Sequence, residues 1–184
     1  MDRENILRRR IRLLTWFFIV GLVVSGATAI PLEWELNLIT HMLGLADGSA
    51  TQPTSGFTIW ILKVRDALHA TNAAYPFMAY GTDWLAFGHF MIAVAFLGAL
   101  RDPVRNVWLF TFGMIACALI VPYAFLFGGL RGIPVYWRLI DCSFGVFGIL
   151  PVWYCWRSVR EIEALQKNIP AALSQSRPQP ESVK

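Results

Sequence analysis

Long uncharged, apolar stretches alternate with charged connections along the 184-residue chain. A helix rises 1.5 Å per residue, so about 17 to 25 apolar residues are needed to cross the hydrocarbon of a bilayer. Four stretches meet this requirement, at about residues 13–30, 84–100, 107–128 and 135–156. The pattern predicts an all-α membrane protein, in which four transmembrane helices form one bundle.

The segment between the first two spans, residues 31–83, shows a different pattern. Two groups of apolar residues recur there at helical spacing, each too short or too charged to span: Leu32, Leu36, Ile39 and Leu43 in the first, and Phe57, Trp60, Ile61, Val64 and Leu68 in the second. Short helices with one apolar face lie in the membrane interface. We therefore expect two interfacial helices, the second capped by Ser55, followed by a folded loop over 71–83.

Beyond the fourth span the chain becomes polar. We expect a single transmembrane domain over residues 1–160 and a tail over 161–184 that starts as a helix and becomes disordered after Pro170. The helical start contains two opposite-charge pairs at i,i+4 spacing: Arg157 with Glu161, and Glu163 with Lys167.

Composition agrees with a membrane protein, and charge placement predicts its orientation. Only 15% of residues are charged, against roughly 25% in soluble domains. The basic residues flank apolar runs instead of forming one patch, so nucleic acid is not an expected partner despite the net charge of +4. If the N-terminus is cytoplasmic, twelve basic residues lie inside: Arg3, Arg8, Arg9, Arg10, Arg12, Arg101, Arg105, Arg157, Arg160, Lys167, Arg177 and Lys184. Four lie outside: Lys63, Arg65, Arg131 and Arg138.

This bias predicts a multi-pass protein of the plasma (inner) membrane with both termini in the cytoplasm. One alternative concerns the first span. Its basic start, its apolar run and Ala27-Thr28-Ala29 also fit a cleavable signal peptide. Cleavage would leave three spans and would not change the orientation of the others.

Polar residues inside the spans are the candidates for chemistry, because an ionisable group at mid-membrane costs about 2.5–3.5 kcal/mol. His89 and Asp141 each lie about five residues inside an outer span end, on the order of 7–9 Å deep, and Tyr123 reaches a similar depth. Arg138 is one turn from Asp141, and Asp83 is at the outer end of the second span. We expect a polar cluster of these five residues in the outer half of the bundle.

The cluster has a structural and a functional interpretation. In the structural one, Arg138 pairs with Asp141 and His89 bonds a backbone carbonyl; in the functional one, the cluster binds a small ligand or a proton. Small residues at helical spacing predict where these helices meet. They are Ala86 and Ala93 beside His89, Gly145 and Gly148 below Asp141, and Gly21, Ser25 and Ala29 on the first span.

Histidines and cysteines give weak signals for metals or redox chemistry. His41, His69 and His89 all fall on the predicted outer side, but they lack the spacing of a metal site, so none is predicted. Cys117, Cys142 and Cys155 lie in apolar segments and are expected to be buried free thiols without a structural disulfide.

The segment RRRIRLLTWFFIVGLVVSG resembles in outline the first helix of di-haem b-type cytochromes. The resemblance implies an axial His near Thr15, where this chain has threonine. Two axial histidines on facing helices are required, and only His89 lies inside a predicted span. We therefore predict no haem and no other cofactor.

The chain contains no Gly-rich phosphate loop, no GxSxG and no HExxH sequence, which does not favour an enzyme. We expect a non-catalytic accessory or assembly component of a membrane complex, whose partners are the bilayer and other membrane-protein subunits. The alternative is an outward-facing intramembrane binding or catalytic site built on His89, Tyr123, Arg138 and Asp141. Transport of a small solute by an oligomer ranks third.

Overall fold

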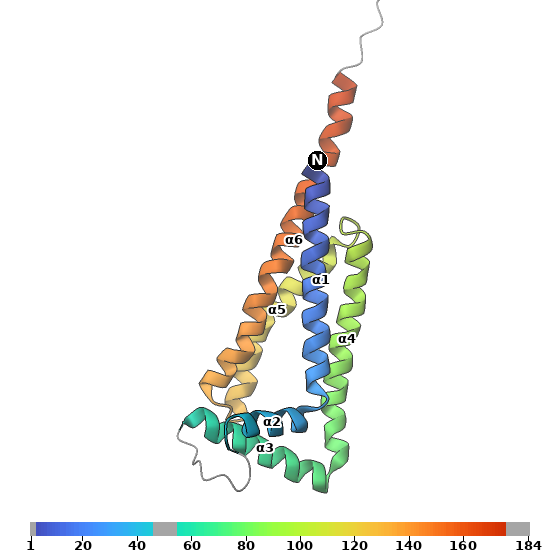
Figure 1. The fold of residues 1–184 in the computed structure, drawn as a ribbon. Helices are drawn as coiled ribbons and strands as arrows, with labels where there is room; N and C mark the ends of the chain where they lie inside the picture. Colours follow the sequence, from blue (N-terminus) through green and yellow to red (C-terminus); the bar gives the residue numbers. More distant parts are fainter. Residues whose placement is uncertain (1–2, 46–54, 176–184) are drawn as a thin grey trace, which may run out of the picture. The chain divides into compact units, whose positions relative to one another are not determined.

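The computed structural model describes residues 3–45 and 55–175, with side chains up to Lys167. Within these ranges the chain is entirely helical and contains no strand (Figure 1). Its elements are α1 (Arg3–Ala29), α2 (Leu32–Met42), α3 (Gly56–Ala74), the 3₁₀ helix η1 (Pro76–Ala79), α4 (Tyr80–Arg101), α5 (Val107–Leu130) and α6 (Val135–Gln175).

The four predicted spans coincide with four helices that are long and apolar enough to cross a membrane: Arg3–Ala29, Pro76–Arg101, Val107–Leu130 and Val135–Lys167. Several boundaries differ from the prediction. The first helix begins at Arg3, ten residues before the predicted span. The expected loop over 71–83 is mostly helical, because α3 runs to Ala74 and α4 begins at Tyr80. The backbone of α6 is helical to Gln175, five residues beyond Pro170, and residues 176–184 of the predicted disordered tail lie outside the described residues.

Local chemistry explains where the helices start and end. Ser55 caps α3 in a reciprocal capping box with Thr58, which confirms the predicted cap. Gly44 and Gly132 adopt positive φ angles of 67° and 68° directly after the C-caps of α2 and α5. At both ends the paired backbone hydrogen bonds of a Schellman motif close the last turn. Glycine suits both positions because it enters the left-handed region without steric cost.

The structure separates into two compact units, with boundaries inside α1 and inside α4. Unit 1 comprises Met1–Ile19 and Val94–Lys184, and unit 2 comprises Val20–Ala93. In unit 1, α5 and α6 lie side by side (Figure 1). A Cβ atom added at Gly145 would lie 2.5 Å from the carbonyl oxygen of Cys117, so the two backbones are nearly in contact. The small residues predicted to face a neighbouring helix below Asp141 do so.

The N-terminal part of α1 packs on α6 within unit 1. Arg3 Nε donates to Glu161 Oε1 at 2.6 Å, and Arg10 donates to the Tyr154 hydroxyl at 3.0 Å. Thr15 is buried, with its hydroxyl 3.9 Å from the Cys155 sulfur. The position at which a haem-binding histidine would be expected therefore serves helix packing.

The charge pairs of α6 differ from the prediction. Glu161 bonds Arg3 in place of Arg157, and Glu163 bonds Arg160 at i,i+3 in place of Lys167. The prediction for Glu161 was wrong because it considered α6 alone, whereas α1 lies beside it and supplies a competing cation. For Glu163 the competing cation is Arg160 of α6 itself. All three cysteines are buried free thiols.

Unit 2 contains α2 and α3, which pack on each other, followed by η1 and the first part of α4. Leu36, Thr40 and Ile61 are buried, whereas Ile39 and Leu43 of the predicted apolar stripe are exposed. Ala86 and Ala93 of α4 are buried, and a Cβ atom at Gly26 would lie 3.0 Å from the Ala86 carbonyl oxygen.

The predicted contact face of the first span is wrong at Gly21, which is exposed, whereas Ser25 and Ala29 of that face are half-buried. A Cβ atom at Gly21 would meet nothing within 4 Å. The buried stripe of α1 follows i,i+4 steps through Leu7, Ile11, Thr15 and Ile19, and Gly21 falls off that stripe.

Candidate functional sites

The residues of the predicted polar cluster divide between the two units. His89 and Asp83 lie on α4 in unit 2, and Tyr123, Arg138 and Asp141 lie in unit 1. Within unit 1 the structure brings Tyr123 and Asp141 to one groove, while Arg138 takes a different role.

This groove, here called the α5–α6 groove, has a volume of about 490 Å³. Most of its wall is apolar and comes from α5, including Leu119, Ile120 and Phe127. Asp141 contributes a carboxyl group from α6, Tyr123 adds a hydroxyl group from α5, and Arg131 adds a guanidinium group from the turn directly after α5. The groove therefore combines a hydrophobic surface with one acidic and one basic side chain.

Arg138 fixes the turn that joins α5 to α6. Its Nε donates to the Ile133 carbonyl oxygen at 2.7 Å. Its stem lies so close to Gly128 that a Cβ atom there would be 2.9 Å from Arg138 Cγ and Cδ. The pairing of Arg138 with Asp141 that the structural interpretation predicts is not formed. Among the contacts of the described residues, Asp141 has neither a hydrogen-bond nor an ion-pair partner.

His89 makes the backbone hydrogen bond that the structural interpretation predicts. Its Nδ1 lies 2.8 Å from the carbonyl oxygen of Leu85, one turn earlier on α4. Asp83 is exposed in the first turn of the same helix.

Unit 2 contains a second groove, here called the α2–α3 groove, also of about 490 Å³. Its walls come from the link between α1 and α2, from α2 and α3, and from the start of α4 with η1. Five of its lining residues are polar: Glu33, Asn37, Thr71, Asn72 and Thr82. Among the described lining residues, Glu33 is the one that carries a formal charge.

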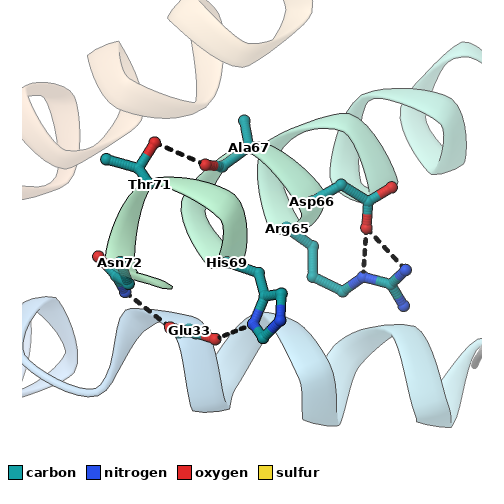
Figure 2. A network of polar contacts seen from close by, with 7 residues as sticks. All are labelled: Glu33, Arg65, Asp66, Ala67, His69, Thr71 and Asn72. Carbon is teal, nitrogen blue, oxygen red and sulfur yellow. Dashed lines mark hydrogen bonds and ion pairs between the residues drawn. The ribbon is translucent and has the colours of Figure 1, made fainter. Parts of the chain in front are cut away.

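Glu33 is the centre of a polar network between α2 and α3 (Figure 2). One carboxylate oxygen lies 2.6 Å from His69 Nδ1, and the other accepts from Asn72 Nδ2 at 2.7 Å. Hydrogen bonds from His69 and then Asn72 hold the pKa of the Glu33 carboxyl below its ordinary value of 4.5. The carboxyl group is therefore ionised at neutral pH.

Sequence reasoning missed this network. Glu33 lies between the apolar positions of the first expected interfacial helix and was not among the candidate residues, and His69 was considered only as a weak metal candidate. One signal was available, since His69 and Asn72 stand three residues apart on one face of α3 and can reach the same acceptor. The identity of that acceptor, 36 residues earlier in the chain, could not be read from periodicity.

The weak metal candidates His41, His69 and His89 do not come together. No group of three or more His, Cys, Asp or Glu side chains able to hold a metal ion exists in the part of the chain that the structure describes.

Comparison of the chain with protein-family models, with curated proteins and with solved structures found no match.

Proposed function

We propose that this chain is an integral protein of the plasma (inner) membrane that acts as a non-catalytic accessory or assembly component of a membrane complex. Membrane embedding is supported by large apolar side chains exposed on all four long helices, among them Phe17 and Val24 on α1, Leu85 and Met91 on α4, Leu119 and Leu126 on α5, and Phe144 and Phe147 on α6. Apolar surface this extensive is stable in contact with lipid or with other helices, not with water.

The first helix remains part of the mature protein in this proposal. Leu7, Ile11 and Thr15 are buried in unit 1, and removal of residues 1–29 would expose the surface of α6 that they cover.

The observation that carries the assembly role is the unpartnered carboxyl group of Asp141. It belongs to a helix long and apolar enough to span a membrane and lines a mostly apolar groove. A charged group in this setting is costly unless it is paired, and such residues in membrane helices pair across helix interfaces. A transmembrane helix of another subunit that places a basic residue opposite Asp141 would supply the pair and would cover the apolar wall.

The test is site-specific cross-linking in the native host. A photoreactive amino acid at Leu119, in the wall of the α5–α6 groove, should cross-link to an apolar segment that contains Arg or Lys, mapped by mass spectrometry. We expect Asp141→Asn to reduce this product about tenfold or more, since losing one charge-assisted hydrogen bond costs about 1.5–3 kcal/mol.

Asp102→Asn is the matched control, because Asp102 lies in the short turn between α4 and α5, away from the groove. An Asp141→Asn protein that inserts stably and gives the same cross-linked product as the wild type would contradict the proposal. So would a wild-type chain that gives no cross-link to another protein.

One observation favours a second candidate, an intramembrane binding site within unit 1: of the residues expected to form such a site, Tyr123 and Asp141 line one groove. In that case Tyr123→Phe and Asp141→Asn should abolish function in stably inserted protein without changing its partners. If both substitutions only lower the yield of folded protein, this candidate loses its support.

A further inference from the structure

The α2–α3 groove is distinct from the groove assigned to assembly, and its polar groups share one property. Three of them, Thr71, Thr82 and Asn72, donate their hydrogen bonds to other groups of the same chain. Thr71 donates its hydroxyl proton to the Ala67 carbonyl oxygen at 2.7 Å, and Thr82 donates to the Ala79 carbonyl oxygen at 2.7 Å. Asn72 Nδ2 donates to Glu33 (Figure 2).

Acceptor capacity remains on the same groups. A hydroxyl oxygen that has donated its proton still offers lone pairs, and each oxygen of a carboxylate accepts more than one hydrogen bond. Thr71 and Thr82 thus present acceptor oxygens to the groove, and Glu33 presents a carboxylate that is partly exposed to it. Asn72 Oδ1, another acceptor, is buried and has no partner.

The charge of the groove also favours a ligand that donates hydrogen bonds, because it favours a cation. Glu33 is negatively charged, and no Lys or Arg is among the described residues that line the groove. Trp34, Leu68 and Met78 supply apolar wall beside these acceptors. A complementary ligand is a cation with several N–H donors attached to an apolar body.

We propose that the α2–α3 groove binds the primary ammonium group of an amphipathic molecule, with Glu33 as the counter-ion and Thr71 and Thr82 as hydrogen-bond acceptors. A primary ammonium has three N–H donors, which matches the acceptors present. A quaternary ammonium has the same charge but no N–H, so it leaves the hydroxyl oxygens unpaired. The ammonium can come from a phosphatidylethanolamine headgroup or from a free alkylamine.

The experiment uses the full-length protein in mild detergent. Native mass spectrometry with equimolar phosphatidylethanolamine and phosphatidylcholine of identical acyl chains measures which lipid is retained. Calorimetry compares the affinity of the protein for n-butylammonium, a free primary ammonium, with its affinity for the quaternary tetramethylammonium. We expect the primary ammonium to be preferred about tenfold or more in at least one pair, because a charge-assisted hydrogen bond contributes about 1.5–3 kcal/mol. Preference for the lipid alone identifies the headgroup, and preference for butylammonium alone identifies the free amine.

Glu33→Gln should remove the preference, whereas Glu35→Gln, the same chemical change on the same helix outside the groove lining, should retain it. Thr82→Val gives a second test that leaves the α2–α3 contacts of Glu33 intact, and it should weaken binding severalfold. The proposal is overturned if primary and quaternary ammonium bind equally in both pairs, if neither binds, or if Glu33→Gln and Glu35→Gln behave alike.

Discussion

The side chain of Glu33 connects two helices by hydrogen bonds, in addition to their apolar contact. The α2–α3 pair buries Leu36, Thr40 and Ile61, and Glu33 adds hydrogen bonds to His69 and Asn72 at its edge. The bonds to the ionised carboxylate explain why its pKa is lowered. Folding therefore favours the charged form of this group.

This linkage predicts a pH dependence with a definite sign. Because the pKa of Glu33 is lower in the folded protein, its contribution to stability is complete above its ordinary value of 4.5 and is lost as the pH falls through the folded value. We expect amide hydrogen exchange in α2 and α3, corrected for intrinsic rates, to accelerate as the pH drops below 4.5.

Glu33→Gln should abolish this acceleration, and Glu35→Gln, an acidic neighbour on α2, should preserve it. Acceleration of equal size in the wild type and in Glu33→Gln would show that another group is responsible.

At the scale of helices, α6 comes nearly into backbone contact with α5 at Gly145. Its hydrogen faces the carbonyl oxygen of Cys117, which belongs to the backbone and cannot rotate away as a side chain would. Any larger residue must therefore separate the two helices.

We expect Gly145→Ala to destabilise the protein by about 1–3 kcal/mol, the usual cost of overpacking, in unfolding experiments in detergent. Gly21→Ala is the matched control, because a Cβ atom there meets nothing and alanine improves helix propensity by up to about 1 kcal/mol. Equal destabilisation by both substitutions would contradict the contact between α5 and α6.

Helices could be predicted from the sequence more completely than the contacts between them. Uninterrupted apolar runs predicted the four long helices, and Ser55 predicted the start of α3. The early start of α4 at Tyr80 was missed, since residues 71–83 were expected to form a loop. Contacts between helices were predicted only where the spacing of small residues marked them. Partners far apart in sequence, such as Glu161 with Arg3, depend on which helices become neighbours, and periodicity contains no such information.

At the scale of the whole molecule, the proposal makes a prediction about which segments share a side of the membrane. Twelve of the sixteen basic residues fall on the side assigned to both termini, so the α2–α3 segment should face the opposite side. Single cysteines can report this, because the three native cysteines are buried.

We expect Thr51→Cys to react with a membrane-impermeant maleimide in intact cells. Ser182→Cys and Arg105→Cys should react only after permeabilisation. Labelling of Thr51→Cys and Ser182→Cys on the same side would refute the proposed topology.

The packing of Arg138 against Gly128 limits how this chain can evolve. The arginine stem occupies the space that a side chain at Gly128 would need, and its guanidinium satisfies the Ile133 carbonyl. A substitution at either position alone would leave a clash or an unpaired oxygen. In descendants of this sequence, residues 128 and 138 are therefore expected to change together or not at all.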